Sequence, residues 1–201
     1  MTTWISKRLF AGAMFLALAS CVEVAGTGGG RASGSGLPFA TLARGAVTLV
    51  PPFGYCIDKR SLRPSFALMA RCDTLGGTAT FGAPLALITA ATVAQNGSAS
   101  VAGPQDETIL ARRQTETLTL LQVRGTPPSA EMRDVFWRAL GQVGNQLVGL
   151  AIYEAAAGPA LGESAPDLLA QTMRRTRAQT AAVAAKAQDN SATTRAKPAL
   201  N

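Results

Sequence analysis

Two alternating apolar segments joined by a Gly-Asn pair restrict the fold of this chain more than any other feature. Residues 136–143 and 146–153 each alternate large apolar side chains with small or polar ones, and Gly144-Asn145 separates them. Glycine and asparagine tolerate the positive φ angles that a two-residue hairpin turn requires. The sequence therefore predicts a β-hairpin. Its expected core positions are Leu140, Val148, Leu150 and Ile152.

The segments before this hairpin predict further strands. They are short, apolar or β-branched, and bounded by proline, glycine or asparagine: 47–50, 84–93 and 117–123. Residues 66–72 are expected to form either the next strand after 47–50 or a short buried segment. We expect 84–93 to be a strand buried on both faces, although periodicity alone also allows a buried helix there. At the open end of the hairpin, we expect Trp137 and Tyr153 to face each other across the strands.

Three segments predict helical structure. Over 102–116, Pro104, Asp106 and Glu107 stand where a helix begins, with Ile109-Leu110 as its apolar contact. Ser129 with Glu131 predicts a single helical turn. Further on, Ser164, Pro166 and Asp167 combine a hydroxyl cap, a first-turn proline and an acid near the positive end of the helix dipole.

The helix that starts at Ser164 carries one modestly apolar stripe: Leu168, Leu169, Met173, Thr176 and Thr180. After Thr180 the stripe thins into alanine, which favours helix but buries little surface. We therefore expect the helix to fray beyond about Lys186. Residues 188–201 lack core-forming side chains, and we expect them to be disordered.

The order of elements predicts a single α+β domain, in which one C-terminal helix packs on an antiparallel sheet. The domain is expected over residues 39–187, preceded by a leader (1–20) and a Gly/Ser-rich tether (21–38) and followed by the tail (188–201). From Phe136 to about Lys186, a hairpin followed by one helix is similar in element order to the PsbP-type fold. That resemblance implies a fold and assigns no functional residues.

The leader is a short positive head followed by an apolar run. Lys7-Arg8 precede twelve uncharged residues, 9–20, which would span about 18 Å as a helix against about 30 Å of hydrocarbon core. This pattern is typical of an export signal. Leu18-Ala19-Ser20-Cys21 resembles the bacterial lipobox. The alternative is an ordinary secretory signal with a cysteine there by chance.

The lipobox resemblance implies lipid attachment to the Cys21 thiol and cleavage before that residue. The chain would then be held at the cell envelope by its lipid anchor, facing the periplasm. Because Val22 follows the cysteine in place of the aspartate typical of inner-membrane retention, the outer membrane is favoured. The glycine-rich tether would give a reach on the order of 20–25 Å.

The positive charge of the chain is concentrated near its C-terminal end. The formal net charge is +7, but residues 21–170 balance 11 basic against 11 acidic side chains, whereas 171–201 hold six basic side chains against Asp189 alone. This distribution argues against a nucleic-acid partner for the folded body. It predicts possible contacts to anionic lipid or cell-wall polymer through Arg174, Arg175, Arg177 and Lys186. A protein-docking segment and a plain solvated tail are the alternatives.

Three cysteines fit the same compartment. With Cys21 lipidated, Cys56 and Cys72 remain as one even pair, which outside the cytoplasm predicts a disulfide. The loop of about 15 residues would stabilise the fold by roughly 3 kcal/mol. A redox-active pair is the alternative, but such pairs are usually spaced more closely.

The chain contains no histidine, so histidine-dependent dyads and histidine metal sites are excluded. We therefore expect no enzyme and no cofactor. Asp58 and Asp73 are the one acid/base or cation-binding candidate, since a Cys56–Cys72 bond would draw them together. Neighbouring basic residues favour ion pairs, or an anion site, instead. The favoured function is a non-catalytic assembly or scaffolding role in the envelope.

Overall fold

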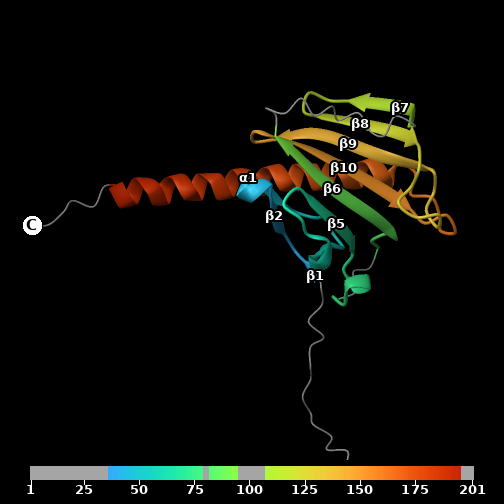
Figure 1. The fold of residues 1–201 in the computed structure, drawn as a ribbon, viewed down its shortest axis with the longest axis horizontal. Coiled ribbons are helices and arrows are strands. Elements are labelled where there is room, and N and C mark those ends of the chain that lie inside the picture. Colours follow the sequence, from blue (N-terminus) through green and yellow to red (C-terminus); the bar gives the residue numbers. More distant parts are fainter. Residues whose placement is uncertain (1–35, 79–81, 95–106, 196–201) are drawn as a thin grey trace, which may run out of the picture. The chain divides into compact units, whose positions relative to one another are not determined.

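A computed structural model describes residues 36–78, 82–94 and 107–195 (Figure 1). The strands are β1 (Gly36–Leu37), β2 (Ala40–Leu42), β3 (Val47–Leu49), β4 (Tyr55–Asp58), β5 (Phe66–Arg71), β6 (Ala86–Ala94), β7 (Thr108–Gln114), β8 (Leu118–Arg124), β9 (Val135–Val143) and β10 (Gln146–Glu154). The helices are η1 (Ala43–Gly45), η2 (Lys59–Ser61), η3 (Asp73–Leu75) and α1 (Ser164–Arg195).

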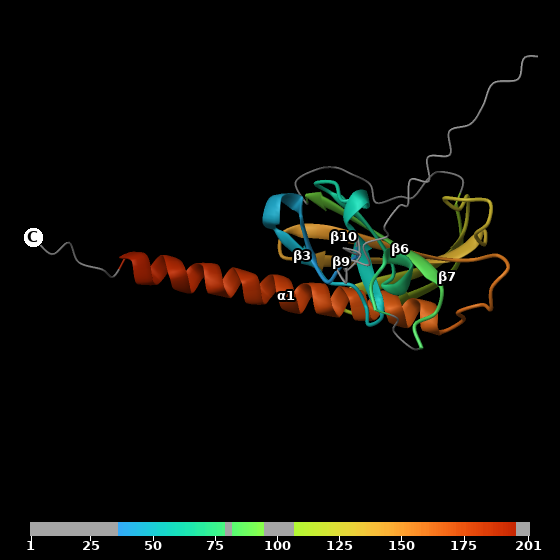
Figure 2. The same cartoon turned by 90° about the horizontal axis from the view of Figure 1, so that it is seen from below.

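One antiparallel sheet dominates the described residues. Its eight strands run in the order β1-β4-β5-β6-β10-β9-β8-β7, and β2 and β3 form a separate antiparallel pair. Helix α1 packs on β3, β9 and β10, and Figure 2 shows it lying along one side of the sheet. The predicted antiparallel sheet with a C-terminal helix against it is therefore confirmed.

The predicted hairpin is β9–β10. Val143 pairs with Gln146 across the turn, where Gly144 has a φ of 57°. Val148, Leu150 and Ile152 are buried as expected. Leu140 is only half-buried, because the alternation of the strand gives its core position to Ala139, which is fully buried.

The aromatic contact at the open end of the hairpin differs from the predicted one. Tyr153 packs against Phe136, with ring centroids 4.7 Å apart, and Trp137 pairs in register with Ile152. The expectation that Trp137 faces Tyr153 is wrong by one residue. A shift of one position moves a side chain to the opposite face of a sheet.

The helix predicted over 102–116 is wrong where the structure describes it. Residues 108–114 form β7, an edge strand that pairs with β8, and Ile109 and Leu110 are 59% and 43% exposed. Pairing with a neighbouring strand decides this segment against its local helix signals. Pro104 and Asp106 lie outside the described residues.

Two smaller expectations are also corrected. Strand β6 buries Ile88, Ala90 and Thr92 on one face, while Ala91 on the other face is exposed, so the strand is not buried on both faces.

The Ser129 segment forms a turn and not the predicted helical turn. In it the Met132 N–H donates to the Ser129 carbonyl at 3.1 Å.

Helix α1 divides into a docked half and a projecting half. Its docked half, 164–180, buries Ala165, Leu169 and Met173 in the core together with the polar Thr172 and Thr176. Every side chain from 181 to 191 is exposed. The helix continues to Arg195, so the expected fraying after Lys186 and disorder over 188–195 are wrong; residues 196–201 lie outside the described part.

The N-terminal end of the predicted domain also shifts. Gly36 and Leu37, which the sequence assigns to the tether, pair with Asp58 and Ile57 as β1. Residues 1–35, with the leader, Cys21 and most of the tether, lie outside the described residues.

Candidate functional site

Cys56 and Cys72 form a disulfide, as their parity predicted. Their Cα atoms are 4.8 Å apart, and the bond joins β4 to the turn that follows β5. Gly36 of β1 packs on this bond so closely that a Cβ there would lie 3.0 Å from the Cys56 Cβ. The disulfide therefore supports the edge strand β1 as well as linking β4 to the end of β5.

Asp58 and Asp73 do not form one carboxylate site. Tyr55 pairs with Arg71, and the Cys72 N–H donates to Gly54, so Asp73 lies beyond the start of β4 while Asp58 ends that strand. The expectation that the disulfide would draw the two carboxylates together is wrong, because the antiparallel strands carry them to opposite ends of β4.

Each of these carboxylates binds an arginine two residues away. Arg60 donates to Asp58 Oδ1 from its backbone N (3.0 Å) and its Nε (3.2 Å). Arg71 donates from Nε to Asp73 Oδ1 at 3.0 Å and from Nη2 to Oδ2. The Arg71 hydrogen bond holds the pKa of Asp73 below its usual value. Both carboxylates act as local ion-pair and turn groups.

The part of the chain that the structure describes contains no group of three or more His, Cys, Asp or Glu side chains arranged for a metal ion. Among its helices, none combines the length and the apolar character needed to cross a membrane.

The basic residues predicted as an anion contact do not act as one group. Arg175 stacks on the Phe53 ring at 4.1 Å. Arg177 donates from Nε to the Gln142 carbonyl at 2.8 Å and from Nη2 to the Thr117 carbonyl. Burial lowers the pKa of Arg177. Arg174 and Lys186 are exposed, so two of the four side chains are available to an outside anion.

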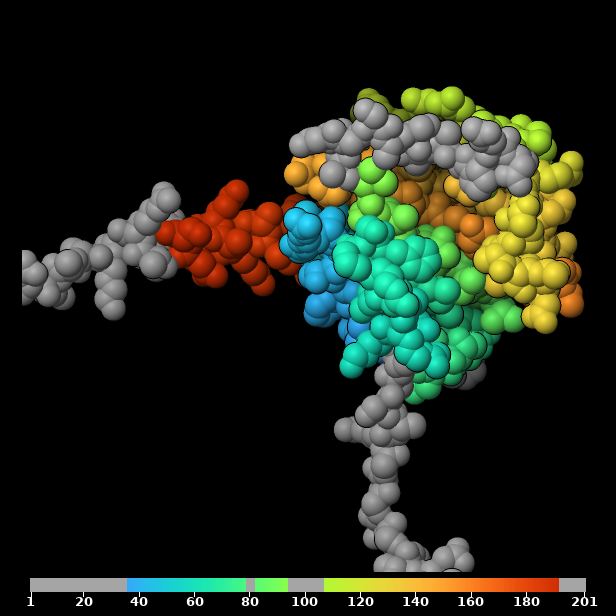
Figure 3. Space-filling view, in the orientation of Figure 1, coloured from blue at the N-terminus to red at the C-terminus, as the bar shows by residue number. Residues whose placement is uncertain are grey.

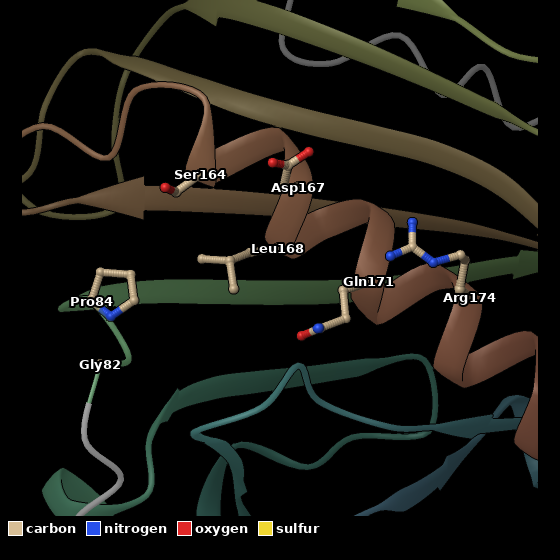
Figure 4. A pocket seen from close by; sticks show the side chains of 7 residues that line it. All are labelled: Gly82, Pro84, Ser164, Asp167, Leu168, Gln171 and Arg174. Atoms are coloured by element: carbon tan, nitrogen blue, oxygen red, sulfur yellow. The ribbon is translucent and has the colours of Figure 1, made fainter.

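A groove of about 550 Å³ runs beside the docked half of α1 (Figure 4). It is lined by Gly82, Pro84, Ser164, Asp167, Leu168, Gln171 and Arg174. Leu168 and Gln171 point from the helix toward the strands below it. Asp167 and Arg174 are two turns apart on the helix, about 10 Å.

Neighbouring backbone fixes the far wall of this groove. The Tyr55 hydroxyl donates to the Pro84 carbonyl at 2.7 Å, and burial raises the pKa of Tyr55 to about 12. The Phe53 N–H donates to Gln171 Oε1 at 3.0 Å. This groove could not be predicted from the sequence, because its walls come from segments about 80 positions apart in the chain.

A second hollow, of about 330 Å³, is dominated by ion pairs. Arg113 lies 5.0 Å from the centre of the Trp137 ring and binds Glu163 through both carboxylate oxygens, at 2.6 and 2.8 Å. Arg133 Nε lies 3.7 Å from Glu154 Oε2, and that oxygen also accepts from the Leu161 N–H at 2.9 Å. Each arginine in this hollow is paired with a glutamate. Such paired charges are typical of structural ion pairs and not of a catalytic site.

The projecting half of α1 has no buried side chain from 181 to 191. Figure 3 shows this end of the helix standing clear of the rest of the described chain. Val183 is 43% exposed there, and its neighbours are mostly alanine. No core residue follows Thr176 along the helix among the residues whose burial is described.

No protein-family model and no curated protein matches this chain. The geometry of the described residues is therefore what bears on function. It presents carboxylates engaged by arginines, a groove beside α1, and a helix that extends beyond its own domain.

Proposed function

We propose that this chain is a lipid-anchored envelope protein with a non-catalytic scaffolding role, and that the projecting half of α1 is its partner-binding arm. The lipobox resemblance at Cys21 supports the anchor, and the periplasmic face of the outer membrane is its proposed location. In this proposal the domain has an α+β fold, and a flexible tether links it to the lipid anchor.

The observation that carries this proposal is the continuation of one helix stripe past the sheet. At about 100° per residue, the buried Leu169, Met173 and Thr176 fall in one sector of α1. The same sector continues through four exposed residues of the projecting half: Val183, Ala184, Ala187 and Ser191. The core-facing stripe therefore runs on without a cover from the described residues.

The docked half explains how this arm stays helical in water. An isolated helix of this length is marginal, because its first turn is unfavourable to form. Packing of 164–180 on the sheet supplies that first turn, and alanine, the best helix former, extends it at little cost. Small side chains also let a partner helix approach closely. We therefore expect the partner to be an envelope protein that offers an apolar helix.

Glutamate substitutions on the stripe, compared with the same substitutions on the opposite side of the helix, test whether the projecting half of α1 binds a partner. Val183→Glu with Ala187→Glu puts two carboxylates on the stripe, whereas Ala182→Glu with Ala185→Glu puts the same charge on the opposite side. Envelopes are extracted in mild detergent and the complexes are sized. We expect the protein and the opposite-side variant to run in a larger complex, and the stripe variant to run alone. Urea unfolding should be the same for all three.

Two results would refute the arm: an unmodified protein that runs as a monomer, or an equal loss of the complex in both variants.

The lipid anchor is tested separately. Radiolabelled palmitate should enter the protein and not its Cys21→Ser form, which should leave the membrane fraction. If Cys21→Ser is processed and retained normally, the lipid anchor is wrong while the arm can still stand.

Binding to an anionic envelope polymer is the second candidate, and the exposure of Arg174 and Lys186 favours it. Arg174→Gln with Lys186→Gln should then abolish salt-sensitive sedimentation with envelopes. The scaffold proposal instead expects sedimentation to depend on Cys21 and to resist salt.

A further inference from the structure

A third hollow is lined by described residues outside α1, where η1, the loop before β5 and the turn end of β10 meet. Its volume is about 390 Å³. Its lining residues are Ala43, Arg44, Pro64, Ser65, Thr92 and Gln146. They come from η1, the loop before β5, β6 and the first residue of β10.

Thr92 brings a buried hydroxyl without a partner to this hollow. Its side chain is 7% exposed, and its Oγ1 makes no hydrogen bond within the described residues. The Thr92 N–H donates to the Ser65 carbonyl at 2.9 Å, which fixes the residue in place. A buried hydroxyl left without a partner is unfavourable and is rare in proteins. Thr92 is therefore poised to bond something that enters the hollow.

Gln146 provides a second buried polar group on the same wall. It is 8% exposed, and its Nε2 donates to Asn145 Oδ1 at 3.2 Å. That bond fixes the side-chain amide at the turn of the β9–β10 hairpin. Two side chains more than nine-tenths buried thus give the hollow a fixed polar interior.

Arg44 provides the charge. Ala43 and Arg44 both adopt the left-handed conformation, with φ of 51° and 56°, which residues other than glycine rarely do. The Ala43 N–H donates to the Pro64 carbonyl at 2.7 Å and holds this turn against the neighbouring loop. The strained turn keeps Arg44 on the wall of the hollow. Among the described residues that line the hollow none is acidic, and Arg44 is the one charged side chain.

We propose that this hollow binds a small organic carboxylate. The guanidinium of Arg44 matches a carboxylate in shape and charge, and the Thr92 hydroxyl donates a further hydrogen bond to it. A volume near 390 Å³ suits a ligand of a few heavy atoms up to a small metabolite. Phosphate would bring a second negative charge, for which the described lining offers no second cation.

Titration of the full-length protein in detergent with acetate and lactate tests the site. In ¹⁵N-labelled protein, the amide signals of Arg44, Thr92 and Gln146 should shift and saturate. Acetamide, which has the shape of acetate without its charge, should cause no saturable shift. Phosphate should bind at least tenfold more weakly than lactate.

Substitutions at Thr92 separate binding from folding. Thr92→Val removes the hydroxyl at nearly constant volume and should weaken lactate binding at least tenfold while leaving the melting temperature unchanged or higher. Thr92→Ser keeps the hydroxyl and should bind within about threefold of the unmodified protein. Arg44→Asn, which tolerates the left-handed conformation, should weaken binding at least tenfold, and the control Arg174→Gln should not.

Unchanged lactate binding in Thr92→Val, saturable binding of acetamide, or the absence of saturable shifts with either carboxylate would each overturn the proposal. Tighter binding of phosphate than of lactate would overturn the carboxylate assignment. None of these results depends on the lipid anchor or on the arm of α1.

Discussion

The side-chain hydroxyl of Thr176 accepts a hydrogen bond from the backbone N–H of Val50, 3.1 Å away. One helix turn later, Thr180 accepts in the same way from the N–H of Thr48, at 2.9 Å. The backbone amides of Thr48 in β3 and of Val50 just after it are therefore bonded by hydroxyls of α1. These are amides that the carbonyls of a neighbouring strand could otherwise have bonded. The helix completes the β2–β3 pair with polar side chains as well as covering it with apolar ones.

Removing the Thr176 hydroxyl should destabilise the fold. Thr176→Val keeps the side-chain shape but leaves the Val50 N–H without a partner in a partly buried place, which should lower the free energy of unfolding by about 1–3 kcal/mol. Urea unfolding measures this loss.

The control for that substitution lies one turn earlier on the same helix. The buried Thr172 donates its hydroxyl to the Leu168 carbonyl at 2.8 Å, and that carbonyl also lies within the helix ladder. Thr172→Val should therefore change stability by less than about 1 kcal/mol. If both variants lose the same free energy of unfolding, the hydrogen bond to the Val50 N–H does not stabilise the fold more than the Thr172 bond does.

Gly141 should accept a side chain only if Arg177 moves aside. A Cβ at this position would lie 2.6 Å from Arg177 Nη2 and 3.2 Å from the Met173 Cε. Gly141→Ala should therefore displace Arg177 from the Thr117 and Gln142 carbonyls and lower stability by about 1–3 kcal/mol, measured by urea unfolding.

Gly149, on the paired strand, is the matched control for Gly141. Its nearest neighbour would be the Leu140 Cδ2 at 3.5 Å, an ordinary contact, so Gly149→Ala should be tolerated. In an Arg177→Ala background, Gly141→Ala should lose much of its effect, since the two residues are in contact. Additive losses would contradict the clash.

Breaking the disulfide should weaken the domain without changing its strand order. The Cys56→Ala, Cys72→Ala double variant loses a crosslink across 16 positions, and its free energy of unfolding should fall by about 3 kcal/mol. Reduction of the unmodified protein with dithiothreitol should shift the urea midpoint in the same direction. Coincident curves for the oxidised and reduced protein would argue that the bond does not constrain the unfolded chain.

Asp73 should make part of the stability depend on acid pH. Because the Arg71 hydrogen bond holds the pKa of Asp73 below its usual value of 3.8, the folded state releases this proton more readily than the unfolded state does. The stabilisation is therefore fully present above pH 3.8 and is lost as the pH falls through the lower, folded-state pKa. Asp73→Asn should be less stable than the unmodified protein at pH 7.

Urea unfolding at a series of pH values checks this sign. The difference between Asp73→Asn and the unmodified protein should shrink steadily below pH 3.8. A difference that persists or grows in acid would mean that Asp73 acts through its turn hydrogen bond to Thr74 and not through its charge.

Features encoded by neighbouring residues were predictable from the sequence. Gly144-Asn145 specifies its hairpin through the turn itself, and the pairing of Cys56 with Cys72 followed from parity. The edge strand β7 was not predictable, because its exposed side chains show no alternation that would indicate a strand. The conformation of such a segment is decided by the strand that it joins.

Contacts between distant segments were also out of reach. Thr176 and Thr180 were predicted to belong to a weak apolar stripe. Their hydroxyls instead accept hydrogen bonds from the N–H groups of Val50 and Thr48, more than 120 positions away. The hollow around Thr92 likewise depends on a strained turn at Arg44, and no local pattern in the sequence indicates that turn. The projecting helix was underestimated because alanine adds little burial, although it adds much helix propensity.

The position of α1 in the chain also governs the order in which the protein can be built. Thr48 and Val50 are among the first described residues to be synthesised, while Thr176 and Thr180 are among the last. Until those hydroxyls arrive, water alone satisfies the edge of β3, and closing so long a loop is slow. A partly synthesised chain therefore lacks the side chains that bond this edge, and we expect folding to be completed only when the final helix is present.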